Sequence, residues 1–206
     1  MAVEIKICGT TNVEDARLAL ELGADYLGFI FYPKSPRSVS ADDVVRILES
    51  LEPRPRAVGV FVNASREEVE RTVAACGLYA AQLHGDEAAE AFRGSAARLW
   101  RAVRVVDAEP RPDPDAWPAE RYLVDAFVPG AYGGTGELAD WAAAAELAKA
   151  RTVMLAGGLT PENVADAIRA VRPVGVDVAS GVEAAPGRKD PDTLRRFIAA
   201  VRAVGR

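Results

Sequence analysis

The sequence predicts an α/β protein whose single domain, residues 1–206, is a (β/α)8 barrel with a parallel eight-stranded sheet. Three observations predict it. Eight short apolar segments recur about every 24 residues, the length that a strand, a crossover helix and two connections occupy. Segments such as Val58-Gly59-Val60-Phe61-Val62 are continuously apolar, as parallel strands buried on both faces are. No composition break divides the chain, which favours one closed barrel over the alternative, an open doubly wound sheet.

Strands and helices are expected to alternate from the start of the chain. The predicted strands cover residues 4–7, 26–31, 57–62, 80–83, 99–103, 122–124, 152–155 and 175–178. Residues 12–22 repeat apolar side chains at helical spacing. Further helix starts are indicated by pairs of capping residues, namely Ser40 with Asp43, Ser65 with Glu68, Thr160 with Pro161, and Asp190 with Pro191.

The segment after the fifth predicted strand departs from this alternation. Proline removes a backbone donor and breaks helices, so a proline-rich segment leaves little room for a regular helix. We therefore expect an irregular connection around Pro110, Pro112, Pro114 and Pro118.

Composition and charge narrow the class of protein. Half of the residues are apolar and 27% are charged, as in ordinary globular proteins. The net charge of −5 and the lack of a basic run argue against a nucleic-acid or anionic-membrane partner. No apolar run approaches the length of a membrane-spanning helix, and the first strand begins too early for a signal peptide, so a cytoplasmic protein is expected. Two cysteines make no disulfide framework, and no spacing indicates a metal site. Monomer and homodimer both stay open.

Groups suited to chemistry follow the predicted strands. In a (β/α)8 barrel the loops after the strands open on one face, where active sites lie. The loops after predicted strands 1, 2, 4, 6, 7 and 8 contain Cys8, Arg37, His84, Asp125, Gly157 with Gly158, and Ser180 with Gly181. Because these groups collect at one rim, the pattern favours an enzyme.

Cys8 and Asp125 are the candidates for proton transfer. At a strand end the Cys8 thiolate can reach a ligand, although many buried cysteines are only small apolar side chains. Cys76, at an alanine-rich helix end, is interpreted as structural. Burial after an apolar strand can keep the Asp125 carboxyl protonated and able to donate, whereas the alternative is a turn or cap residue. The two can face each other across the barrel mouth.

The loops after the seventh and eighth predicted strands are the candidate phosphate site. Gly157-Gly158 and Ser180-Gly181 allow backbone amides to approach a phosphate closely, although ordinary tight turns would also use glycine. Arg37 could bind a carboxylate with its forked donors or simply lie in solvent. His84 could contact a ligand or sit at the rim.

A glycine-dense segment, residues 130–136, follows Asp125. Glu137 stands where a Walker motif has lysine, which excludes nucleotide binding by that route. A lid and an irregular loop are equally compatible with it.

Several of these segments match one known pattern together. The chain opens with Lys6-Ile7-Cys8-Gly9-Thr10-Thr11, and further matching blocks cover residues 28–37, 58–63, 82–87, 132–136, 155–159 and 176–183, together with Asp125. The set resembles the phosphoribosylanthranilate isomerases of tryptophan biosynthesis. Thr10 and Ser38 depart from that family, where an aliphatic and an aromatic residue are usual, and neither position carries a catalytic role in it.

The resemblance implies an Amadori rearrangement of N-(5'-phosphoribosyl)anthranilate to 1-(2-carboxyphenylamino)-1-deoxyribulose 5-phosphate, with no cofactor and no metal. Asp125 would then be the general acid that opens the ribose ring, and Cys8 the general base at ribose C2. Arg37 would hold the anthranilate carboxylate. The phosphate and the rest of the phosphorylated substrate would be contacted by His84, Gly157, Gly158, Asp177, Ser180 and Gly181.

Other interpretations rest on different chemistry. A phosphosugar epimerase of the same fold would need metal-binding histidines, and the chain has one histidine. Indole-glycerol-phosphate synthase is another phosphosugar barrel. A bifunctional isomerase shared with histidine biosynthesis would be expected to have aspartate where Cys8 stands. A non-catalytic phosphate-binding barrel would have no use for Cys8 opposite Asp125.

Overall fold

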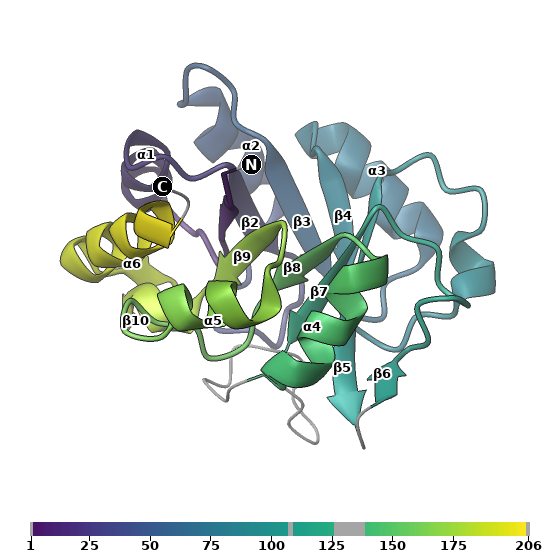
Figure 1. Cartoon of the computed structure of the whole chain (residues 1–206). Helices are drawn as coiled ribbons and strands as arrows, with labels where there is room; N and C mark the ends of the chain where they lie inside the picture. The colour runs from purple at the N-terminus through teal and green to yellow at the C-terminus, as the bar shows by residue number, and fades with distance from the viewer. Residues whose placement is uncertain (1, 107–108, 126–138, 205–206) are drawn as a thin grey trace.

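The chain folds into a closed ring of parallel strands with helices on the outside (Figure 1). The computed structural model describes residues 2–106, 109–125 and 139–204. The ring is formed by β1 (Glu4–Ile7), β2 (Tyr26–Ile30), β3 (Ala57–Phe61), β4 (Ala80–Leu83), β5 (Leu99–Val106), β7 (Arg121–Asp125), β8 (Val153–Leu155) and β9 (Gly175–Val178). These pair in the order β4-β3-β2-β1-β9-β8-β7-β5, and β4 pairs with β5 to close the ring. The predicted (β/α)8 barrel is confirmed.

The observed strands lie where they were predicted, with shifts of one to three residues at some ends. β5 continues to Val106, beyond its predicted end at residue 103, because its last residues pair with a short antiparallel strand, β6 (Glu109–Arg111). β7 includes Asp125 as its final residue, so this carboxyl stands on the strand itself and not in the loop after it.

Six α-helices cover the outside of the described barrel: α1 (Val13–Glu21), α2 (Ala41–Glu49), α3 (Arg66–Cys76), α4 (Trp141–Ala150), α5 (Val164–Val171) and α6 (Pro191–Val204). Ser40 and Asp43 form the predicted capping box of α2. The predicted start of α5 is wrong, because a turn fills residues 161–163: the carbonyl oxygen of Thr160 accepts from the amide of Asn163, and the helix begins at Val164. None of the helices in the described ranges is long and apolar enough to cross a membrane.

Two of the barrel's connections contain no α-helix. A short 3-10 helix, η1 (Ala89–Phe92), connects β4 to β5. Between β5 and β7 the described residues form β6 and a turn, as the prolines predicted. Trp117 packs against Phe92 there, with ring centroids 5.8 Å apart, so aromatic side chains cover the sheet where a helix would otherwise lie.

Alternation along the strands divides the side chains between two cores. Outward residues such as Ile5 and Ile7 pack against the helices. A second cluster of inward residues fills the inside of the barrel: Tyr26, Val58, Ala80, Trp100, Ala102, Leu123, Met154 and Ala156. β1 differs, because Glu4 and Lys6 occupy its inward positions and Cys8 continues the same side beyond its end.

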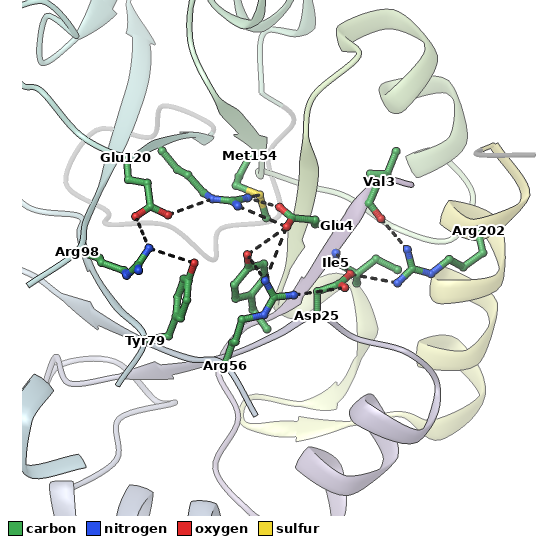
Figure 2. Close-up of polar contacts among 12 residues, drawn as sticks. Val3, Glu4, Ile5, Asp25, Arg56, Tyr79, Arg98, Glu120, Met154 and Arg202 are labelled. Carbon is green, nitrogen blue, oxygen red and sulfur yellow. Dashed lines mark hydrogen bonds and ion pairs between the residues drawn. The ribbon is translucent and has the colours of Figure 1, made fainter. Parts of the chain in front are cut away.

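A cluster of polar side chains closes the amino-terminal end of the barrel (Figure 2). Glu4 accepts hydrogen bonds from Arg121 and, at 3.1 Å, from the Tyr26 hydroxyl. The Arg56 guanidinium lies over the Tyr26 ring, 4.3 Å from its centroid, and 3.7 Å from Asp25. Because this end is filled, room for a ligand lies at the opposite end, where the strands finish.

Candidate active site

A pocket opens at the carboxyl end of the barrel. It is lined by all nine predicted site residues, Cys8, Arg37, His84, Asp125, Gly157, Gly158, Asp177, Ser180 and Gly181. Its empty volume is about 790 Å³, a figure that includes the solvent at its open mouth. The structure therefore brings together groups that lie up to 173 positions apart in the chain.

Strand geometry puts these side chains in the pocket. Lys6 pairs in register with Asp177 on the neighbouring strand β9, and both point inward. Cys8 lies two residues after Lys6 and therefore on the same inward side, one layer higher. Asp125, at the end of β7, enters the pocket from another part of the ring.

Cys8 stands among buried charges. The Lys6 ammonium is fully buried and lies 2.8 Å from Asp177 Oδ1. Burial raises the pKa of the Cys8 thiol, whereas the positive charge of the nearby Lys6 acts to lower it. The negative charge of Asp177 adds to the rise, and the net pKa of the thiol lies above its ordinary value.

A second buried network supports the other side of Cys8. Lys189, from the short hairpin of β10 (Glu183–Ala185) and β11 (Arg188–Lys189), donates to the Cys8 carbonyl oxygen at 2.6 Å and to Glu183 at 2.9 Å. Arg37 donates to the same carboxylate through Nε at 2.9 Å and Nη2 at 2.7 Å. Burial alone would raise the pKa of Glu183, but the Arg37 hydrogen bonds and Lys189 outweigh it and hold that pKa below its ordinary value.

Asp125 has a polar neighbour in the pocket, whereas the apolar strand before it suggested a largely apolar setting. Its Oδ2 lies 3.2 Å from His84 Nε2, and His84 Nδ1 lies 3.0 Å from Gln82 Nε2. When the Gln82 amide donates to Nδ1, the neutral imidazole carries its proton on Nε2, facing Asp125. The imidazole therefore lies between the Gln82 amide and the Asp125 carboxyl.

The loops after β8 and β9 meet backbone to backbone. Gly157 and Gly158 have φ angles of 79° and 61°, in the left-handed region that glycine adopts without strain. A Cβ added to Gly181 would lie 1.9 Å from the carbonyl oxygen of Leu159. Ser180–Val182 forms a short 3-10 helix, η2. Asn163 braces the first loop by donating to the Gly158 carbonyl at 2.9 Å.

Four polar side chains of this region were not predicted as site residues: Lys6, Gln82, Glu183 and Lys189. A signal for Lys6 exists in the sequence, because it shares the inward side of β1 with Cys8 in a strand that is otherwise buried. Lys189 reaches the site because its hairpin lies next to the end of β1, and no sequence pattern indicates that these two segments are in contact.

The glycine-dense segment and the metal ligands are considered only as far as the described residues reach. The glycine-dense segment 130–136 lies outside the described residues. Within the described ranges, no three histidine, cysteine, aspartate or glutamate side chains come together as metal ligands would.

Fold and site together define a (β/α)8-barrel enzyme with a thiol and a carboxyl in one pocket. A family model described as N-(5'phosphoribosyl)anthranilate (PRA) isomerase matches residues 5–200. An N-(5'-phosphoribosyl)anthranilate isomerase of Magnetococcus marinus is 47% identical over 202 residues, covering 98% of this chain and 96% of the relative. The chain belongs to the N-(5'-phosphoribosyl)anthranilate isomerase family.

Solved structures agree with this family at the level of the fold. A phosphoribosyl anthranilate isomerase from Thermus thermophilus superposes with a TM-score of 0.88 at 39% identity and covers 98% of this chain and 100% of its own. A second isomerase, solved in complex with reduced 1-(o-carboxyphenylamino)-1-deoxyribulose 5-phosphate, has a TM-score of 0.83 at 40% identity, with 98% and 99% coverage.

Proposed function

We propose that this chain converts N-(5'-phosphoribosyl)anthranilate to 1-(2-carboxyphenylamino)-1-deoxyribulose 5-phosphate in tryptophan biosynthesis, with Cys8 and Asp125 transferring the protons. The isomerase function rests on the family membership and on relatives of the same name over the full length. The observation that supports the site is the convergence of a thiol, a carboxyl and two glycine loops on one pocket.

Asp125 is the proposed general acid. Donation of its proton to the ring oxygen of the ribose opens the furanose and leaves a Schiff base between ribose C1 and the anthranilate nitrogen. His84 supports this role by its position, because its imidazole Nε2 lies 3.2 Å from the carboxyl inside the pocket.

Cys8 is the proposed general base. The hydrogen at ribose C2 is acidic next to the iminium, so a thiolate in the pocket can remove it. The enolamine that results tautomerises to the ketone of the product. This step needs the thiolate. Burial disfavours that form, and the positive charges of Lys6 and Lys189 oppose the effect of burial.

The remaining residues are proposed to hold the two acidic ends of the substrate. Glu183 occupies the Nε and Nη2 edge of Arg37, so the Nη1 edge is the one suited to the anthranilate carboxylate. Glycine loops and the start of η2 suit the phosphate, as in other barrels of this fold. The phosphorylated, carboxylated ligand bound by the related isomerase has both of these ends.

Direct assay tests the function. Purified protein is added to freshly prepared phosphoribosylanthranilate, and the loss of substrate fluorescence is followed against a reaction without enzyme. We expect enzyme-dependent loss, with the aminodeoxyribulose phosphate identified by mass spectrometry. Substrate that decays only at the uncatalysed rate would contradict the proposal.

We further propose a cytoplasmic location and an assembly no larger than a homodimer. Two free, buried cysteines suit a reducing compartment. One related isomerase, from Thermotoga maritima, is described as dimeric, and its structure is that of monomers generated from the dimer. Size-exclusion chromatography with light scattering measures the mass of the protein in solution and decides between a monomer and a homodimer.

A further inference from the structure

The Lys6 ammonium has more N–H donors than it has oxygen acceptors among the described residues. It is fully buried in the middle of the barrel, where an unpaired charge is costly. An ammonium has three N–H donors, and among the described residues Asp177 Oδ1 is the oxygen that accepts from it, at 2.8 Å. The sulfur of Cys8 is a further acceptor, and it lies near the end of the Lys6 side chain.

Gly28 on β2 has no side chain and so leaves the space in which Lys6 and the Cys8 sulfur lie near each other. A Cβ added to Gly28 would lie 2.8 Å from Cys8 Sγ and 3.1 Å from Lys6 Cε, so the sulfur and the end of the lysine side chain meet in the space that a methyl group would fill. The register explains the arrangement, because Lys6 pairs with Tyr26 and the next inward residue of β2 is Gly28.

We propose that Lys6, held by Asp177, is the counter-ion that stabilises the Cys8 thiolate. Lys6 is therefore a positioning residue: it does not contact the reacting atoms of the substrate but makes the base available. The inference rests on the proposed role of Cys8 and adds a residue to it.

Lys189 acts differently although it is also buried next to Cys8. Its ammonium binds the Cys8 carbonyl oxygen, the Ala179 carbonyl oxygen and Glu183, so its three donors are used. It holds the backbone of Cys8 in place, whereas Lys6 faces the sulfur. The charged groups around Cys8 come from several elements, namely Lys6 on β1, Asp177 on β9, Glu183 on β10, Lys189 on β11, Arg37 after β2, and His84 and Asp125 across the pocket.

The test measures the acidity of Cys8 without using catalysis. The protein is labelled with iodoacetamide between about pH 6 and pH 10, and mass spectrometry reports the rate at each cysteine. Lys6→Met removes the positive charge, so the apparent pKa of Cys8 should rise by about one unit, which makes labelling near neutral pH about tenfold slower. Asp177→Asn removes a negative charge from the same pair, so the pKa of Cys8 should fall.

Shifts of the Cys8 pKa in opposite directions in the two variants indicate an electrostatic role. Damage to packing would shift the pKa in the same direction in both. Cys76 is the internal control, since it is fully buried and becomes labelled only if the fold opens. Unchanged labelling in Lys6→Met, or shifts of the same sign in both variants, would overturn the inference. If Lys6→Met does not fold, Lys6→Gln takes its place: a raised pKa of Cys8 in that variant supports the inference, and an unchanged or lower pKa overturns it.

The acid limb of the kcat profile should follow the labelling pKa in each variant. This readout distinguishes the inference from the proposed function. If Cys8→Ala keeps its turnover, the base assignment fails while the labelling result still stands. If Cys8→Ala is inactive and the labelling profile does not respond to Lys6, the base assignment stands and the inference fails.

Discussion

Cys8 and Asp125 reach the same pocket from different strands because each stands at an inward position where its strand ends. Side chains two residues apart on a strand share a side, so Lys6 and Cys8 project into the barrel together. Both candidate proton-transfer groups are nearly buried, with 6% of Cys8 and 8% of Asp125 exposed. Their neighbours therefore control their protonation more than water does.

Loss of either proton-transfer group should stop turnover without unfolding the protein. Cys8→Ala and Asp125→Asn are each expected to lower kcat at least about 100-fold, because a general acid or base contributes that much or more. Binding of the reduced product analogue should survive in both. Cys76→Ala is the matched control, a buried cysteine outside the pocket, and should keep its kcat. A variant that retains a tenth of the turnover would remove that residue from the mechanism.

Arg37 should act mainly on substrate binding. Arg37→Ala removes charged hydrogen bonds to the anthranilate carboxylate, so KM should rise about 10- to 100-fold with a smaller change in kcat. Lys189 keeps Glu183 paired in this variant, so the pocket should stay folded. Arg37→Lys retains the charge without the fork and should lie between the two. Steady-state kinetics measures this, and an unchanged KM would rule out the carboxylate contact.

At the scale of elements, short connections place the site groups. The loops after β8 and β9 come within contact distance because Gly181 has no side chain. The helix that follows each loop leads the chain away, and Asn163, in the turn before α5, ties that turn to the Gly158 carbonyl. Where the helix is missing, between β5 and β7, Trp117 covers the sheet and its indole donates to the Glu87 carbonyl at 3.1 Å.

Gly181→Ala should weaken phosphate binding. The new methyl group would meet the Leu159 carbonyl oxygen and push the two loops apart, so KM should rise about tenfold or more, the effect of losing about 1.4 kcal/mol of binding free energy. Gly94→Ala is the control, because its φ of 73° imposes backbone strain while the methyl group would meet no atom within 4 Å. It should lower stability and leave KM alone. Equal KM values in the two variants would contradict the phosphate assignment.

At the scale of the whole molecule, the barrel separates stability from chemistry. Its amino-terminal end holds Glu4, Arg121 and Arg56 in a half-buried network around Tyr26, whose pKa burial raises to about 12 (Figure 2). The tyrosine therefore stays neutral and donates to Glu4. The pocket lies at the opposite end, so substitutions in this network should act on folding and not on turnover.

Glu4→Gln tests this separation. The change removes the carboxylate that accepts hydrogen bonds from the Arg121 guanidinium, whose side chain is 13% exposed, and leaves Glu120 Oε1 at 3.8 Å from Nε, so the free energy of unfolding should fall by about 1–3 kcal/mol. Values of kcat and KM should stay within twofold or so of the wild type. Glu146→Gln breaks an exposed pair and should change stability little. Urea unfolding measures both, and a large loss of turnover in Glu4→Gln at full folding would contradict the separation.

Local patterns in the sequence were enough to predict the strands, most helix starts and eight of the nine candidate residues, whereas Asp177 was named only through the resemblance to the isomerase family. The reason is that strand position and carboxyl-end loops are set by residues close together in the chain. The predicted helix start at Thr160 was wrong because Thr160 and Asn163 form a turn before the helix. The Thr160 amide donates to Asn163 Oδ1 and the Asn163 amide donates to the Thr160 carbonyl oxygen, a local detail that the capping pattern does not reveal. The roles of the nine residues stay predictions for the experiments above.

What only the tertiary structure decided is the environment of those residues. Lys6 meets Asp177 across 171 positions, and Lys189 meets the Cys8 carbonyl across 181. Such contacts depend on closure of the ring, which brings β1 beside β9 and the hairpin of β10 and β11 beside Cys8. The sequence by itself determined which groups stand at the mouth of the barrel, and the closed ring determined which charges surround them, because pairing across the ring is a property of the folded chain alone.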